Sequence, residues 1–210
     1  QLNVVTGSHG TLSPEDWVDD LLDGVCQRLD TLSPDHEAVQ YCVARMIPPD
    51  QYFRLFYIVH ANDIVSLAPK YTDSLTTDEP RLVIPFHREN GKIVGVAMRA
   101  IREHKKRYIM VRFEEENTLI FGLNLVDRTK PIIVLEGQFD SLFIPNSIAC
   151  GGTSFNKVET FGLPKELVTI VFDNQPRNHE VVKIMEKYVT MGYKVCIWPR
   201  GIEQKDVNEM

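Results

Sequence analysis

The first third of the chain carries apolar residues at helical spacing. After an irregular stretch over residues 1–12, interpreted as a linker or cloning remnant, apolar positions recur every three or four residues. Ser13 and Ser33 each precede a proline, an arrangement typical of a helix start. The pattern predicts three helices, over residues 13–29, 33–47 and 51–57.

From residue 81 the pattern changes to short runs rich in β-branched and aromatic residues. Four runs predict strands, over residues 81–86, 93–100, 107–113 and 118–123. Asn90-Gly91, between the first two runs, is a strong hairpin signal. The region from about residue 81 to residue 122 is therefore expected to be an antiparallel unit.

Beyond Pro131, strands and helices are predicted to alternate. The apolar runs that predict strands cover residues 132–136, 147–150, 168–173 and 193–198. The segments between them predict helices, over residues 140–145, 155–162 and 178–192. Such alternation implies a parallel sheet with helices on both faces. We expect an α/β fold in which a parallel-sheet domain, residues 131–210 and truncated at its C-terminus, follows a smaller mixed α+β subdomain, residues 13–130.

Two acidic residues stand at the ends of predicted parallel strands. Glu136 ends the first of these strands and Asp173 ends the third. Ligands of open parallel sheets bind beyond the carboxyl ends of the strands, so neighbouring strands would direct both carboxylates into one crevice. Gly137 allows a sharp turn, and Asp140 lies one helical turn further along the chain. The cluster indicates a Mg²⁺ site; the alternative is that these acids cap helices and stay solvated.

The distribution of charge adds a second candidate surface. The formal net charge of −6 argues weakly against a pure nucleic-acid-binding module. The segment over residues 99–112, however, holds six basic residues and one acid, Glu103, with Tyr108 and Phe113 interleaved. Cations alternating with aromatic rings are typical of surfaces that bind single strands. The alternative is an ordinary solvated face.

The remaining composition limits the protein class. Hydrophobic residues make up 43% of the chain and charged residues 25%, as in ordinary soluble proteins. No apolar run reaches the length of a membrane span and no signal peptide opens the chain, so an intracellular protein without a membrane partner is expected. The four cysteines are scattered without C-x-x-C spacing, so we expect reduced core thiols and no zinc site.

Motifs around the strand-end acids resemble the Toprim domain of DNA primases, topoisomerases and related nucleases. "LEGQFDSL", "ACGGTSF", "IVFDNQP" and "KDVNE" follow one another in the order of that family, over about residues 130–210. Gln175 replaces the second acid of the family's D-x-D motif, so an uncharged ligand is expected there. The resemblance implies metal ligands at Glu136, Asp140, Asp173, Gln175 and Asp206. Nucleotide contacts are expected from Gly152, Thr153, Arg177 and Lys205; the alternative for Arg177 is simple solvent exposure.

The resemblance extends upstream to the segment that precedes Toprim in bacterial-type primases. "RLVIPFHRENGKIVGVAMRAI", "KRYIMVRF" and "LIFGLN" are similar to that segment, and "RLDTLSPDHEAVQYCVARMIPPDQY" looks most similar to primases of the T-even phage type. This part implies nucleic-acid contacts from Arg81, Arg99, Arg107 and Tyr108.

The resemblance implies synthesis of RNA primers from nucleoside triphosphates on a single-stranded DNA template. Glu136 and Asp173 would be the catalytic residues, with Mg²⁺ or Mn²⁺ as the cofactor. A replicative helicase is the expected partner, and the host cytoplasm is the expected location for a phage protein. Two alternatives stay open: a Toprim-type metal-dependent endonuclease, and a nucleic-acid-binding module weakened as a catalyst at Gln175.

Overall fold

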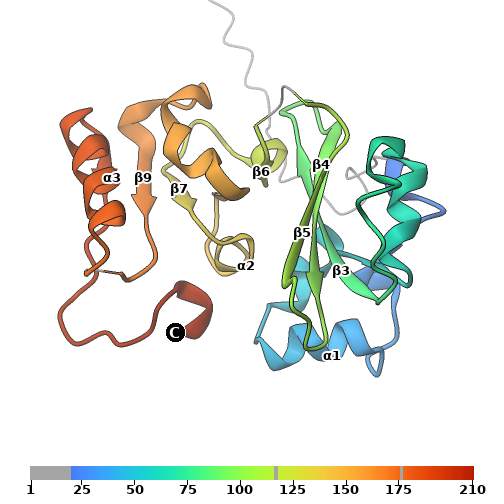
Figure 1. Cartoon of the computed structure of the whole chain (residues 1–210). Helices are drawn as coiled ribbons and strands as arrows, with labels where there is room; N and C mark the ends of the chain where they lie inside the picture. The colour runs from blue at the N-terminus through green and yellow to red at the C-terminus, as the bar shows by residue number, and fades with distance from the viewer. Residues whose placement is uncertain (1–19, 116–117, 176) are drawn as a thin grey trace, which may run out of the picture.

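The fold consists of two five-stranded sheets that stand side by side (Figure 1). A computed structural model describes residues 20–115, 118–175 and 177–210, without the side chains of residues 152–154. The strands are β1 (Gln27–Arg28), β2 (Phe56–Ile58), β3 (Arg81–His87), β4 (Ile93–Ala100), β5 (Tyr108–Arg112), β6 (Ile120–Phe121), β7 (Ile132–Leu135), β8 (Ser147–Cys150), β9 (Val168–Val171) and β10 (Lys194–Val195).

In the residues that the structure describes, three α-helices and several 3₁₀ helices connect these strands. The α-helices are α1 (Glu37–Ala44), α2 (Gln138–Ser141) and α3 (His179–Thr190). The 3₁₀ helices are η1 (Asp20–Leu22), η2 (Leu29–Thr31), η3 (Pro49–Arg54), η4 (Ala61–Ser66), η5 (Pro69–Tyr71), η6 (Leu123–Leu125), η7 (Gly152–Thr160), η8 (Lys165–Leu167) and η9 (Val207–Glu209). No helix in the described ranges is both long and apolar enough to cross a membrane.

The first sheet is antiparallel and contains β1 to β5 in sequence order. The predicted hairpin joins β3 to β4, and Gly91 in its turn has a φ of 83°, which glycine adopts without steric cost. Leu82 pairs with Arg99, and Arg99 pairs in turn with Tyr108. Strands β3, β4 and β5 agree with the sequence prediction.

The second sheet has the order β10-β9-β7-β8-β6. Strands β7 to β10 are parallel, as predicted, whereas β6 pairs antiparallel with β8. We expected the run over residues 118–123 in the first antiparallel unit. Ile120 instead pairs with Cys150, so β6 caps the edge of the parallel sheet. It also lies against β3, and it therefore links the two sheets.

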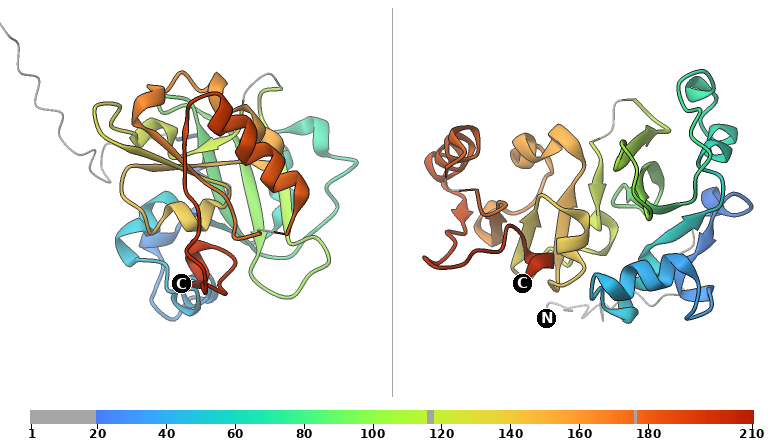
Figure 2. Two further views of the ribbon diagram at one scale, coloured as in Figure 1. Left: turned by 90° about the vertical axis from the view of Figure 1, so that its left-hand side faces the viewer. Right: turned by 60° about the horizontal axis from the view of Figure 1, so that its bottom comes forward.

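Three hydrophobic clusters build the layers between and outside the sheets. One lies between the sheets and contains Phe86, Ala149 and residues of α1 and α2. Another packs α3 and η7 against the opposite face of the parallel sheet. Helices therefore cover both faces of that sheet, as predicted. The third cluster packs η4 and η5 against the outer face of the antiparallel sheet (Figure 2).

The N-terminal helix predictions were only partly correct. Residues 20–22 form one 3₁₀ turn, Gly24 has a φ of 81°, and Gln27 pairs with Tyr57, so strand pairing prevails over helical spacing; residues 13–19 lie outside the described part. The second predicted helix starts later, because His36 caps α1 by accepting a hydrogen bond from the amide of Ala38 at 3.2 Å. The third becomes η3 followed by β2.

Candidate metal pocket and nucleic-acid interface

Strands β7 and β9 bring the two strand-end acids together. The strands are neighbours, with Leu135 opposite Val171, so Glu136 and Asp173 leave the same edge of the sheet. A pocket at this edge is lined by both acids together with Leu135, Val171, Phe172, Trp198, Val207, Asp140 and Asp206. The predicted crevice therefore exists.

Asp140 belongs to the same pocket because its side chain folds back over Gly137. Asp140 is 6% exposed. A Cβ at residue 137 would lie 2.0 Å from Asp140 Oδ2, so the carboxylate occupies the space that any larger residue would need. Gly137 itself has a φ of −91°, which does not require glycine. Close approach, and not the sharp turn that we expected, is the reason for glycine here.

The C-terminal segment closes the pocket from the other side. The Asn174 side chain donates to the carbonyls of Ile202 and Gln204, both at 2.9 Å, and thereby holds this segment against the end of β9. Lys205 forms an ion pair with Asp173 at 3.0 Å. Asp206 caps η9 through the amide of Glu209 at 3.0 Å. Lys205 and Asp206 are thus placed at the pocket by residues 202–209.

The carboxylates in this pocket raise one another's pKa. Burial, together with the charges of Asp206 and Asp173, raises the pKa of Asp140 to about 7, although the amide of Asn208 opposes the shift. Burial and Asp173 likewise raise the pKa of Glu136, and Lys205 opposes this. The hydrogen bond to Asp173 raises the pKa of Lys205. Negative charge therefore accumulates here beyond what one lysine balances.

The donor set fits a hard divalent cation that arrives with phosphate ligands. Mg²⁺ typically takes one or two protein carboxylates and fills its remaining positions with water and phosphate oxygens. Glu136 and Asp173 can supply such carboxylates. Within the described ranges, no group of three or more His, Cys, Asp or Glu side chains forms a ready metal cage.

Gln175 is not turned toward the carboxylates as a ligand. Its side-chain amide nitrogen faces Asp173 Oδ2 at 3.4 Å, while its oxygen accepts a hydrogen bond from Asn178 at 2.9 Å. The expected ligand role of the Gln175 oxygen therefore does not match this arrangement. The amide instead bridges Asp173 to the start of α3.

A chain of hydrogen bonds leads from the pocket to the antiparallel sheet. The backbone N–H of Asn208 donates to Asp140 Oδ1 at 2.7 Å. The Asn208 side chain accepts from Arg45 Nη1 at 2.9 Å and donates to the Arg45 carbonyl at 2.8 Å. The Arg45 guanidinium also lies over the Phe139 ring of α2, 5.3 Å from its centroid. Arg45, just after α1, is therefore held beside the carboxylates.

At the far end of this series of hydrogen bonds, two arginines donate to one hydroxyl group. Tyr41 Oη accepts hydrogen bonds from Arg45 Nε at 2.8 Å and from Arg99 Nε at 2.9 Å. The Arg99 guanidinium packs on the Tyr108 ring, 4.6 Å from its centroid. Neither arginine has a carboxylate within ion-pair distance in the described part of the chain. Arg99 is only 8% exposed, and its expected nucleic-acid contact stays a prediction.

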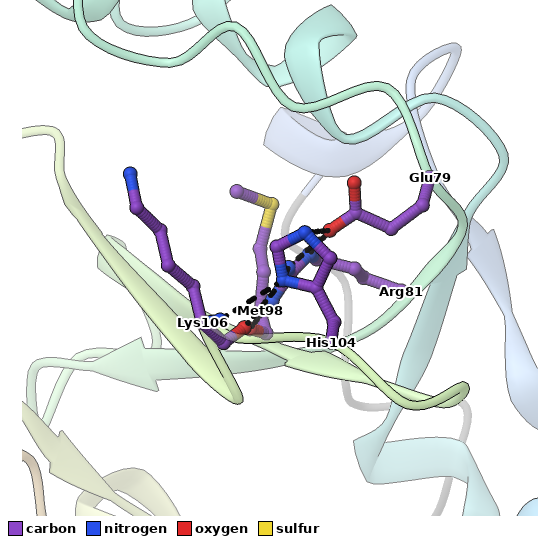
Figure 3. A network of polar contacts seen from close by, with 5 residues as sticks. All are labelled: Glu79, Arg81, Met98, His104 and Lys106. Carbon is purple, nitrogen blue, oxygen red and sulfur yellow. Dashed lines mark hydrogen bonds and ion pairs between the residues drawn. The ribbon is translucent and has the colours of Figure 1, made fainter.

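Arg81 does not reach the surface, contrary to our expectation of a nucleic-acid contact. Its side chain is 0% exposed. It donates to Glu79 Oε1 from Nε at 2.8 Å and to the Met98 carbonyl at 3.1 Å (Figure 3). A second guanidinium nitrogen lies 3.1 Å from His104 Nδ1. Arg81 is therefore a structural residue of the antiparallel sheet.

The remaining predicted contacts stay predictions. Arg107 and Arg177 are exposed, and Tyr108 is 40% exposed. Gly152 and Thr153 begin η7 after β8, and their side chains lie outside the described part.

Sequence reasoning missed Arg45, Tyr41 and Asn208. Tyr41 and Arg45 are spaced four residues apart, and Met46 follows with a φ of 56°, a left-handed conformation that ends the helix with Arg45 beside the pocket. Isolated charged and aromatic residues in a predicted helix carry no signal of this kind. Only the fold brings α1 to the C-terminal segment.

Comparisons with known proteins show what the chain is similar to. No protein-family model matches the chain. The chain is 36% identical to the DNA primase of Enterobacteria phage T4 over 188 residues, which cover 88% of this chain and 54% of that protein. The chain thus spans about half the length of this curated relative.

Two solved structures are similar in fold. The E. coli primase catalytic core aligns with a TM-score of 0.65 at 17% identity, covering 90% of this chain and 74% of that structure. The DnaG primase catalytic domain bound to single-stranded DNA aligns with a TM-score of 0.62 at 16% identity, covering 90% and 72%. These likenesses confirm the expected α/β fold.

Proposed function

We propose that the chain synthesises short RNA primers on single-stranded DNA, because it has the fold of a primase catalytic core and is 36% identical over 188 residues to a phage DNA primase. The observation that carries the proposal is the hydrogen-bonded chain joining Asp140 to Arg45 and Tyr41. It places a pocket of carboxylates next to two arginines without acidic partners. Nucleotidyl transfer needs carboxylates that bind the divalent cations and basic side chains that bind the phosphates.

The carboxylate pocket would hold Mg²⁺ or Mn²⁺ together with the triphosphate. Glu136 and Asp173 are the proposed ligands, because they share one edge of the sheet. The ions would activate the attacking 3′ hydroxyl and neutralise charge on the leaving pyrophosphate. Asp140 and Asp206 would orient the surrounding water shell.

Residues of the chain prepare this site in three ways. Asn174 and Asn208 hold the C-terminal segment, so Lys205 and Asp206 remain beside Asp173. Lys205 neutralises part of the carboxylate charge, and it can turn toward a phosphate when a cation takes its place. Arg177, exposed at the start of α3, is a further candidate for the triphosphate.

The template would run over the cationic face formed by Arg45, Arg99, Arg107 and Tyr108. Arg99 and Tyr108 pair across β4 and β5 and present a guanidinium stacked on an aromatic ring. Bases can stack on such a platform while the arginines meet backbone phosphates. The structure of a DnaG catalytic domain with single-stranded DNA supports this assignment by fold likeness. A helicase partner and a phage host cytoplasm remain proposals from the T4 similarity.

Primer synthesis can be tested with the chain, labelled ribonucleoside triphosphates, single-stranded templates of varied sequence and Mg²⁺ or Mn²⁺. We expect metal-dependent RNA products of a few nucleotides, and none from Glu136→Gln. Cleavage of the template without RNA synthesis would favour the endonuclease alternative. DNA binding without either reaction, and without measurable metal binding, would favour the weakened binding module.

A further inference from the structure

The loop between β4 and β5 presents three cations that the described part of the chain leaves without acidic partners. Lys105, Lys106 and Arg107 are exposed and form no ion pair there. Arg102 in the same loop differs, because it pairs with Glu37 at 2.7 Å. The loop leads directly into Tyr108, whose ring packs on Arg99. Its cations therefore extend the cationic face away from the carboxylate pocket.

His104 ties this loop to the buried arginine of β3. Its Nδ1 accepts from the amide of Lys106 at 3.0 Å and lies 3.1 Å from Arg81 Nη2 (Figure 3). The guanidinium of Arg81 is fixed by Glu79 and by the Met98 carbonyl. The loop is thus anchored through His104 to a side chain that cannot move without disrupting the sheet.

The surroundings of His104 select one tautomer. Two donors face Nδ1, the Lys106 amide and the Arg81 guanidinium, whereas one acceptor, the Lys106 carbonyl, lies 3.2 Å away. Neither donor can accept a hydrogen bond, so an unprotonated Nδ1 satisfies two partners. The proton then resides on Nε2, which lies 3.6 Å from Glu79 Oε1.

We propose that His104 is a positioning residue for template binding, through which buried Arg81 orders Lys105, Lys106 and Arg107 for the phosphate backbone. This inference rests on the proposed function, since it assumes that single-stranded DNA is the ligand. Ordering a loop of long side chains before binding removes part of the entropy cost of association. His104 would not contact DNA itself.

The test replaces His104 by residues that retain or lose the acceptor. His104→Asn places an amide oxygen near the position of Nδ1, while His104→Ala removes the acceptor and His104→Gln moves it further along the side chain. Binding of a fluorescent single-stranded DNA is measured by anisotropy over a range of salt, with EDTA present. Limited trypsin digestion, read by mass spectrometry, reports loop order through cleavage after residues 105, 106 and 107.

We expect His104→Ala and His104→Gln to bind DNA roughly fivefold more weakly, from the cost of ordering the loop, and to be cut faster in the loop. His104→Asn should restore both properties. Lys183→Ala, which removes an exposed lysine of α3 outside the loop, controls for unspecific effects of a surface substitution and should change neither. In ¹⁵N spectra, the His104 ring of the unaltered chain should show protonated Nε2.

Three results would overturn the inference. Equal affinity and equal loop cleavage in His104→Ala and the unaltered chain would show that His104 does not position the cations. Weaker binding without faster cleavage would indicate direct contact. If His104→Ala fails to fold, the same criteria apply to His104→Gln, and His104→Asn remains the variant expected to match the unaltered chain. Failure of the unaltered chain to bind single-stranded DNA would instead overturn the proposed function and this inference with it.

Discussion

The side-chain amide of Asn208 makes two hydrogen bonds with Arg45, a residue 163 positions earlier in the chain. One bond reaches the guanidinium and the other the backbone carbonyl. The backbone N–H of Asn208 at the same time donates to Asp140 Oδ1. Asn208 therefore fixes the position of the C-terminal segment relative to α1 and α2. The geometry of the carboxylate pocket depends on that position.

Asn208→Ala should weaken the attachment of the C-terminal segment to α1 and α2. We expect loss of about 1–2 kcal/mol in the free energy of unfolding and a higher Mg²⁺ requirement for primer synthesis, because two hydrogen bonds disappear beside the pocket. Asn146→Gly is the matched control, since Asn146 also bonds to backbone carbonyls but lies before β8 at the opposite end of the sheet. The control should be similarly destabilised with an unchanged Mg²⁺ requirement. Equal Mg²⁺ responses of the two variants would refute the proposed role.

Gln175→Asp should tighten metal binding. The side chain of residue 175 faces Asp173, so a carboxylate there adds negative charge next to a proposed ligand. Calorimetry should show Mg²⁺ affinity increased roughly tenfold, as added charge attraction predicts. Gln175→Asn controls for the altered side-chain length without adding charge. Weaker binding by Gln175→Asp would mean that the amide has a role that a carboxylate cannot fill.

Arg107→Ala and Glu136→Gln should separate DNA binding from catalysis. Arg107 is exposed, and we expect its loss to weaken single-stranded DNA binding equally for all sequences. The slope of log affinity against log salt should fall by about 0.7 for the lost phosphate contact. Glu136→Gln should bind DNA normally and make no primer. An unchanged affinity and salt slope in Arg107→Ala would make this residue part of a solvated face.

Gly122→Ala should destabilise the fold more than Gly91→Ala. Both glycines have positive φ, 81° and 83°, so both substitutions incur about 1–2 kcal/mol of backbone strain. At residue 122 the new Cβ would additionally lie 2.6 Å from Arg54 Nη2, whereas nothing lies within 4 Å at residue 91. Chemical denaturation should show a further loss of about 1–3 kcal/mol for Gly122→Ala. Equal losses would mean that Arg54 moves aside freely.

Acid should destabilise the chain below pH 6.5 through His87. Burial, and then the charge of Arg54, lowers the pKa of His87 from 6.5 to about 3. The unfolded chain therefore binds a proton that the folded chain does not, so stability is lost as pH falls from 6.5 toward 3. One proton corresponds to about 1.4 kcal/mol per pH unit. Denaturation of His87→Gln between pH 6.5 and 5 should show a shallower slope; an equal slope would assign the effect to other groups.

The sequence predicted the parts of the fold that local pattern controls. Alternating short strands and helices beyond Pro131 specify a parallel sheet, and the strand ends place Glu136 and Asp173 correctly. Asn90-Gly91 specifies its hairpin by backbone chemistry alone. In each case, neighbouring residues in sequence contain the decisive information.

The sequence could not predict what depends on distant partners. The helical spacing of residues 20–29 is overridden because Gln27 pairs with Tyr57. Arg81 was expected to contact nucleic acid because of the resemblance to the primase segment, yet its contacts with Glu79 and His104 hold it inside the protein. The pairing of Arg45 with Asn208 joins opposite ends of the chain, and no periodicity encodes it.

The position of β6 at the edge of the parallel sheet determines where the chain can be divided into fragments. A cut at residue 130 separates β6 from β8 and leaves the backbone groups of Ala149 and Cys150 without their strand partner. It would also remove β6 from its place against β3. Residues 131–210 expressed alone would present a bare edge able to recruit strands from other copies. A fragment beginning before residue 118 keeps that edge covered, and amide exchange in β8 should be slower in it than in the shorter piece.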